Sequence, residues 1–137
     1  MKKKYFEIVF LLFLGVVTSL SLPPYNYFIL NFFTFTAFFI FLFKKSEIIK
    51  NKKLSFFYGW LFGFGYFFSS LYWISISLTF DQSFKFLIPL TIVLIPAFLA
   101  IFYGMVSLCF VTLKPKRIVS SFFTFSLIFG ILEFIRG

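Results

Sequence analysis

Histidine is absent from this sequence of 137 residues, and cysteine occurs once, at Cys109. Without histidine, these residues cannot build a Ser-His-Asp or Cys-His nucleophile system or most kinds of zinc site. A single cysteine cannot form a disulfide within the chain. Cys109 lies in an apolar stretch without a neighbouring base or cation, so we expect a small buried side chain rather than a reactive thiolate.

Charge is also scarce, because only 12% of the residues are charged and only 4 are acidic. The four carboxylates are scattered, at Glu7, Glu47, Asp81 and Glu133. A general acid–base pair needs two such groups together, so we predict no catalytic residue, metal site or cofactor in this chain. Glu7 follows Lys3 by four residues, a spacing that predicts an ion pair on the helix surface.

Hydrophobic residues make up 61% of the chain, and phenylalanine alone supplies 28 residues. This composition is far from that of a soluble protein and indicates a membrane protein. The net charge of +9 would suggest nucleic-acid binding in a soluble protein. Here the basic residues form short clusters between apolar runs, so we predict no nucleic-acid partner and attribute them to membrane topology.

Five apolar runs approach or exceed the roughly 20 residues that a helix needs to cross a bilayer. They cover residues 5–22, 25–43, 54–80, 86–113 and 118–137. In lipid only helices and closed barrels satisfy the backbone, and continuous runs of this length favour helices. We therefore predict an all-α membrane protein with about five transmembrane helices, with kinks at Pro89 and Pro96.

The basic residues predict the orientation of these five spans. One set of connections holds Lys2, Lys3, Lys4, Lys44, Lys45, Lys50, Lys52, Lys53, Lys114, Lys116 and Arg117. Only Lys85 and Arg136 fall on the other side. Because cytoplasmic loops are enriched in lysine and arginine, the N-terminus is predicted to be cytoplasmic. The Pro23-Pro24 turn and the final charged pair then lie at the outer face.

The first 24 residues have a second interpretation. A basic start, an apolar stretch and the small residues Ser19 and Ser21 are also typical of a cleaved signal peptide. We favour an uncleaved first helix, because more apolar spans follow directly. N-terminal sequencing that begins at Met1 would exclude the signal peptide and, with it, a secreted product.

The third run carries a stripe of small and polar residues. Steps of three and four residues along one helix face connect Gly59, Gly63, Tyr66, Ser70, Trp73 and Ser77. Gly59 and Gly63 form a Gly-x-x-x-Gly pattern, which predicts close helix packing. Ser70, Trp73 and Ser77 either line a lipid headgroup site or anchor the helix at the interface.

Glu133 and Arg136 are three residues apart at the end of an apolar run. This spacing places them one helical turn apart and predicts an ion pair. Charges in or near a membrane span are candidates for a functional site. A structural alternative is an arginine that reaches the interface from a helix end.

Four segments together resemble the N-terminal part of bacterial apolipoprotein N-acyltransferases. They are LSLPPYNYF after the first run, the Gly-rich GWLFGFGYFFSSLYWISISLTF, then PAFLAIFYGMVSLCF, and finally ILEFIRG. The four motifs occur in the order of the family, and the resemblance extends from about Ser21 onward.

The resemblance implies a multi-span enzyme of the bacterial inner membrane. Such enzymes transfer an acyl chain from a phospholipid donor to the amine of a diacylated lipoprotein cysteine. The family uses a Glu-Lys-Cys set in an outer nitrilase-like domain, which this sequence lacks, and Cys109 does not match its nucleophile. The resemblance thus implies the membrane scaffold of the enzyme, inactive alone.

Two expectations about the chain as a whole remain open. One is a truncated N-terminal fragment whose reading frame continues past Gly137, with later elements covering Glu133 and Arg136. The other is a complete small membrane protein without catalysis, such as a transporter subunit or an assembly factor. A stop codon after Gly137 in an intact gene would favour the second.

Overall fold

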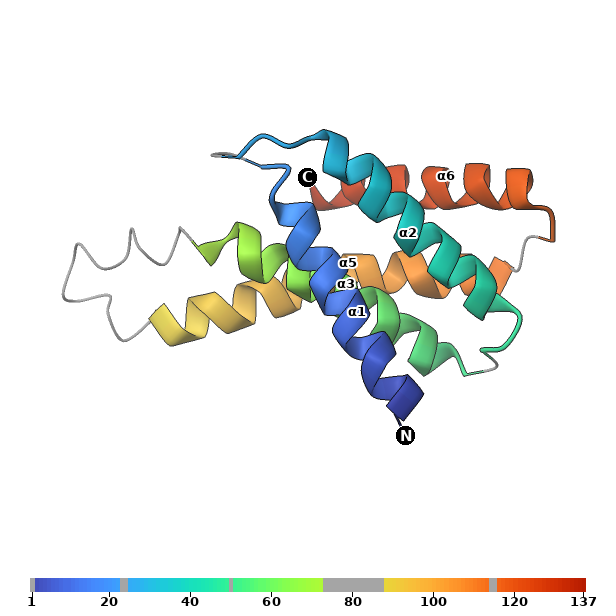
Figure 1. The fold of residues 1–137 in the computed structure, drawn as a ribbon, viewed down its shortest axis with the longest axis horizontal. Coiled ribbons are helices and arrows are strands. Elements are labelled where there is room, and N and C mark those ends of the chain that lie inside the picture. Colours follow the sequence, from blue (N-terminus) through green and yellow to red (C-terminus); the bar gives the residue numbers. More distant parts are fainter. Residues whose placement is uncertain (1, 23–24, 50, 73–87, 114–115) are drawn as a thin grey trace.

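The computed structural model describes residues 2–22, 25–49, 51–72, 88–113 and 116–137. Five α-helices lie within this part of the chain (Figure 1). They are α1 (Lys2–Ser19), α2 (Ile29–Ser46), α3 (Lys52–Ser70), α5 (Ile88–Leu113) and α6 (Ile118–Arg136). The predicted all-α class with five helices is confirmed for the described residues.

Local chemistry explains several helix ends. The Asn51 side chain accepts a hydrogen bond of 3.0 Å from the Lys53 backbone N–H and so caps the start of α3. Asn26, in the turn before α2, has a φ of 56°, a conformation that asparagine tolerates better than most residues. Pro89 lies in the first turn of α5, where a missing N–H costs nothing, and the helix continues through Pro96.

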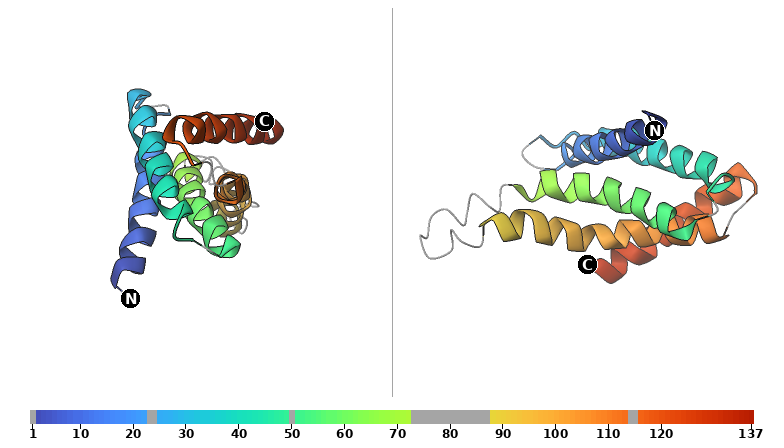
Figure 2. Two further views of the ribbon diagram at one scale, coloured as in Figure 1. Left: turned by 90° about the vertical axis from the view of Figure 1, so that its right-hand side faces the viewer. Right: turned by 90° about the horizontal axis from the view of Figure 1, so that it is seen from below.

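Helix α3 lies in the middle of the bundle, between α1 and α5 (Figure 2). Glycines on two of its faces allow this close approach. A Cβ on Gly59 would lie 2.3 Å from the carbonyl oxygen of Tyr103 in α5, and a Cβ on Gly65 would lie 2.5 Å from that of Leu12 in α1. Small residues let helix backbones approach closely in lipid, where dispersion and hydrogen bonds drive association.

Phenylalanine rings fill the space between the other helices. Phe38 of α2 stacks on Phe62 of α3 with ring centres 4.2 Å apart. Phe125 of α6 meets the ring of Phe38 at 6.0 Å and that of Phe110, from α5, at 5.7 Å. Edge-to-face pairs of this kind contribute about 0.5–1.5 kcal/mol each beyond the area they bury. These four rings therefore tie α2 and α6 to the α3–α5 pair.

Large apolar side chains cover much of the outer surface, including Phe32, Phe33, Phe123, Leu127 and Phe134. An exposed apolar surface of this extent is what a helix bundle presents to lipid. Within the described residues, α2, α5 and α6 are long and apolar enough to cross a membrane. Helix α1 carries charges over its first turns, and α3 is rich in glycine, serine and tyrosine.

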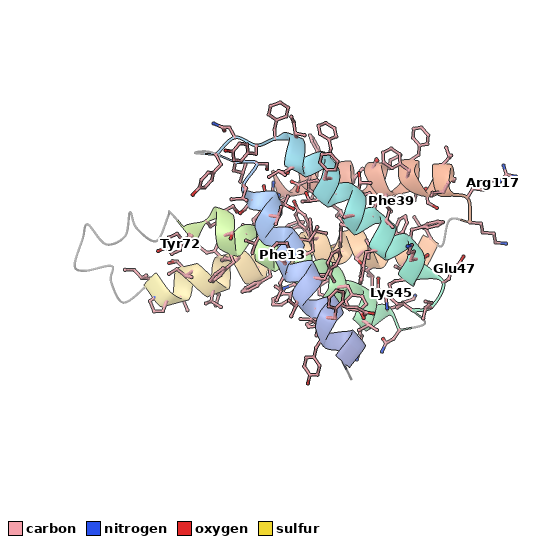
Figure 3. All side chains as sticks on the ribbon, viewed as in Figure 1. Phe13, Phe39, Lys45, Glu47, Tyr72 and Arg117 are labelled. Carbon is pink, nitrogen blue, oxygen red and sulfur yellow. The ribbon has the colours of Figure 1, made fainter. Side chains whose placement is uncertain are left out.

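The basic connections gather at one end of the bundle. The end of α2, the start of α3, the end of α5 and the start of α6 all lie there (Figure 1). Figure 3 labels Lys45, Glu47 and Arg117 at this end, and Tyr72 at the other. We call it the basic end. The structure contains no membrane, so the side on which this end lies remains a prediction.

Candidate functional site

The candidate site at the end of α6 is a cluster formed by Tyr103, Glu133 and Arg136. Glu133 accepts a hydrogen bond of 2.9 Å from the Tyr103 hydroxyl in α5 and one of 2.8 Å from Nε of Arg136. The Arg136 guanidinium also pairs with Glu133 and lies 5.2 Å from the ring centre of Phe67 in α3. The ion pair predicted from the spacing is therefore present. The cluster connects α3, α5 and α6.

Packing fixes the Tyr103 hydroxyl in this cluster. The Tyr103 side chain is buried, and its ring contacts the rings of Phe62, Phe67 and Phe129 from three directions. Glu133 and Arg136 are 28% and 29% exposed, so the charged groups lie at the edge of the bundle. Both carboxylate oxygens of Glu133 already accept hydrogen bonds. This arrangement is suited to holding α6 in place, and it offers no free base for proton transfer.

A second polar cluster joins the first three helices nearer the basic end. Glu7 of α1 pairs with Lys45 of α2 at 2.5 Å and accepts a hydrogen bond of 2.6 Å from the Tyr58 hydroxyl of α3. The sequence indicated a pair between Glu7 and Lys3, whose side chain lies outside the described residues. The contacts with Lys45 and Tyr58 were missed, because they exist only once three helices have packed together.

Two buried serines connect α3 and α5 directly. The Ser55 hydroxyl donates to the Ser107 carbonyl oxygen at 2.9 Å, and the Ser107 hydroxyl donates to the Ser55 carbonyl oxygen at 2.7 Å. Trp60 Nε1 adds a bond of 3.0 Å to the Ala97 carbonyl oxygen. Sequence reasoning did not identify these bonds. Ser55 lies one helical turn before Gly59, and Ser107 lies one turn after Tyr103. Because Gly59 contacts Tyr103, this matching spacing was the sequence signal that could have predicted the serine pair.

The structure describes only part of the predicted stripe. Gly59 and Gly63 face α5, where a Cβ on Gly63 would lie 2.7 Å from Cβ of Tyr103. The Ser70 hydroxyl donates to the Phe67 carbonyl oxygen of its own helix at 3.3 Å. Trp73 and Ser77 lie outside the described residues, so their headgroup or anchoring role stays a prediction.

The described residues contain no recognisable reaction centre. Cys109 has a free thiol and is half-buried. No group of three His, Cys, Asp or Glu side chains in the described ranges is close enough to hold a metal ion. The clusters around Glu133, Glu7 and Ser55 all join helices.

An apolar groove runs between α2 and α6. Its volume is about 330 Å³, and it is lined by Asn31, Phe32, Phe35, Thr36, Phe39, Phe122, Phe125, Ser126, Phe129 and Gly130. The Asn31 Oδ1 atom is buried and accepts no hydrogen bond from the described residues. A groove with such walls can hold an apolar chain.

The comparisons of this chain with known proteins identify the same family. Residues 14–137 match the apolipoprotein N-acyltransferase N-terminal domain. The chain is 35% identical over 133 residues to the apolipoprotein N-acyltransferase of Rhizobium rhizogenes, which covers 90% of this chain. It is 33% identical over 129 residues to that of Allorhizobium ampelinum and 39% identical over 98 residues to that of Rhizobium etli.

These relatives are much longer than the chain. It spans 24% of the Rhizobium rhizogenes protein and 18% of the Rhizobium etli protein. No solved structure matches it.

Proposed function

Because the chain belongs to the apolipoprotein N-acyltransferase family, we propose that it is the membrane-embedded scaffold of such an enzyme. The whole enzyme transfers an acyl chain from a phospholipid to the N-terminal amine of a diacylated lipoprotein in the bacterial inner membrane. The observation that carries this proposal is the family match over residues 14–137. The order of the four motifs supports it.

In this proposal all five helices cross the membrane, with the basic end in the cytoplasm. The positive-inside tendency supports this orientation, because the basic connections lie at one end of the bundle. Helices α1 and α3 are the less apolar spans. Helix α3 packs between α1 and α5, which reduces the surface that it exposes to lipid. The end of α6 then lies at the outer side.

The cluster of Tyr103, Glu133 and Arg136 has a positioning role in this scaffold. It fixes the last turn of α6 against α5 by the hydrogen bond from Tyr103 and against α3 by the contact of the Arg136 guanidinium with the Phe67 ring. Ser70, Trp73 and Ser77 are proposed to lie at the same outer level, where they contact lipid headgroups or anchor α3. None of these residues makes or breaks a bond in the reaction.

The test uses the natural gene that encodes these residues, in a bacterium depleted of its own apolipoprotein N-acyltransferase. Mass spectrometry of the N-terminal peptide of an abundant lipoprotein measures the N-linked acyl chain. We expect the gene to restore N-acylation and the 137-residue segment alone to leave it absent. The proposal would be refuted if the product of the gene inserted into the membrane but did not restore N-acylation. It would also be refuted if the segment alone restored N-acylation.

Two variants separate scaffold from chemistry in the same assay. Glu133→Ala removes the acceptor for both Tyr103 and Arg136, so it should lower the amount of folded protein and N-acylation together. The matched change Glu47→Ala removes an exposed carboxylate at the basic end and should leave both at the level of the unchanged protein. If Glu133→Ala abolished N-acylation at an unchanged level of folded protein, the positioning role would be wrong.

A further inference from the structure

A second groove lies between α1 and α3, near the basic end. Its volume is about 440 Å³, and it is lined by Lys4, Tyr5, Ile8 and Phe57. This volume is within the range of about 300–1,000 Å³ typical of small-molecule sites. Three of the four side chains are largely apolar, and Tyr5 and Phe57 are exposed. The groove therefore combines one cation with a long apolar wall.

A second lysine, Lys53, lies one helical turn before a residue that lines the groove. Lys4 precedes Ile8 by four residues on α1, and Lys53 precedes Phe57 by four residues on α3, so each lysine shares a helix face with a residue that lines the groove. Both lysines are exposed. Within the described part of the chain, neither ammonium group pairs with a carboxylate.

The nearest carboxylate does not neutralise these lysines. Glu7, beside Ile8, is engaged with Lys45 and the Tyr58 hydroxyl. Its charge is thus balanced by Lys45, and the groove keeps an excess of positive charge. One lysine in the lining, a second lysine one helical turn from the lining and an apolar wall match one class of molecule, which has a negative head and a hydrocarbon tail.

We propose that this groove binds an anionic phospholipid, with the phosphate at Lys4 and Lys53 and an acyl chain along Ile8 and Phe57. Juxtamembrane lysines attract anionic lipids near the membrane surface. Long lysine side chains at a helix end reach the headgroup level while their stems lie on apolar residues. The bound lipid stabilises the contact between α1 and α3 at the basic end. On the proposed function it is distinct from the acyl donor, because the basic end then lies on the cytoplasmic side, opposite the outer face where the reaction takes place.

The experiment measures lipid binding by the full natural protein in detergent, by native mass spectrometry. The probes are phosphatidylglycerol, phosphatidylcholine with the same acyl chains, and inorganic phosphate. The test variant is K4Q/K53Q. The matched control is K116Q/R117Q, which removes two positive charges from the connection between α5 and α6.

We expect the protein to prefer phosphatidylglycerol to phosphatidylcholine. K4Q/K53Q should weaken phosphatidylglycerol binding about tenfold or more, whereas the control should change it less than twofold. Phe57→Ala keeps both lysines and should still weaken binding several-fold, because it removes an acyl-chain contact. This second variant tests the groove independently of charge.

Three results would overturn the proposal. The first is equal loss of phosphatidylglycerol binding in K4Q/K53Q and in the control, which indicates diffuse attraction to positive charge. The second is unchanged binding in both K4Q/K53Q and Phe57→Ala. The third is competition by millimolar inorganic phosphate without any effect of Phe57→Ala, which indicates an anion site rather than a lipid site. The readout does not depend on acyl transfer.

Discussion

Replacing Gly59 with alanine would push the two central helices apart. A Cβ at this position would lie 2.3 Å from the Tyr103 carbonyl oxygen and 2.6 Å from Cβ of Ser107. The oxygen belongs to the backbone of α5, so no side-chain rotation can relieve the contact. Restoring an ordinary separation requires α3 and α5 to move apart by roughly 1 Å.

The cost follows from what that movement would break. The bonds of 2.9 Å and 2.7 Å between Ser55 and Ser107 lie one turn away and would exceed hydrogen-bonding distance. Bonds of this kind between membrane helices contribute about 0.6 kcal/mol each on average. A gap of 0.5–1 Å also forfeits about a quarter to a half of each dispersion contact. Alanine recovers about 0.5–1 kcal/mol of helix propensity, which offsets most of the loss of the two hydrogen bonds. The net loss is then mainly the dispersion between α3 and α5, on the order of 1 kcal/mol or more.

The assay is unfolding of the purified protein in mixed micelles by increasing SDS, with the free energy of unfolding as the measured quantity. Gly130→Ala is the matched control, because nothing lies within 4 Å of the Cβ that it adds on α6. It should be neutral or should stabilise the protein by up to about 1 kcal/mol. If Gly59→Ala were as stable as Gly130→Ala, the close contact between α3 and α5 would be incorrect.

Three further changes test two polar contacts and the role of Cys109. Tyr103→Phe removes the hydroxyl that donates to Glu133 and should lower the free energy of unfolding by about 1 kcal/mol in the same assay. The double change with Glu133→Gln should cost less than the sum of the two single changes, and additive costs would contradict the contact. Glu7→Gln leaves Lys45 half-buried without its counter-charge and should cost about 1 kcal/mol, whereas the exposed Glu47→Gln should cost almost nothing; equal costs would exclude the second cluster. Cys109→Ala should change stability by less than about 1 kcal/mol and leave lipoprotein N-acylation, measured by mass spectrometry, unchanged; loss of N-acylation would place chemistry in this chain.

The helices could be predicted from the sequence because lipid leaves the backbone few alternatives. Continuous apolar runs of membrane length must be helical, so the all-α class followed directly. The helix ends were harder to predict, because α1 begins at Lys2 and α3 at Lys52. Lysines can occupy the first turn while their ammonium groups reach the interface, so a helix can begin before its apolar run does.

The polar contacts within one helix could be predicted, and those between helices could not. Glu133 and Arg136 are neighbours by spacing alone. Tyr103, which donates to Glu133, lies 30 residues away in sequence and looks like any aromatic residue in an apolar run. The pairing of Ser55 with Ser107 likewise depends on which faces of α3 and α5 meet. Helix periodicity gives a face for each residue but does not identify the opposing helix.

The most direct test of the five-span scaffold compares the sides on which Asn51 and Lys116 lie. Helices α3 and α5 separate these two positions, so they share a side only if both helices cross the membrane or neither does. In a Cys109→Ala background, Asn51→Cys and Lys116→Cys should both react with a membrane-impermeant maleimide only after the inner membrane is opened. Asn26→Cys and Tyr72→Cys should react before, and protection of Tyr72→Cys would mean that α3 does not cross. Labelling of Asn51→Cys and Lys116→Cys from opposite sides would contradict the five-span account, and labelling of both from outside would reverse its orientation.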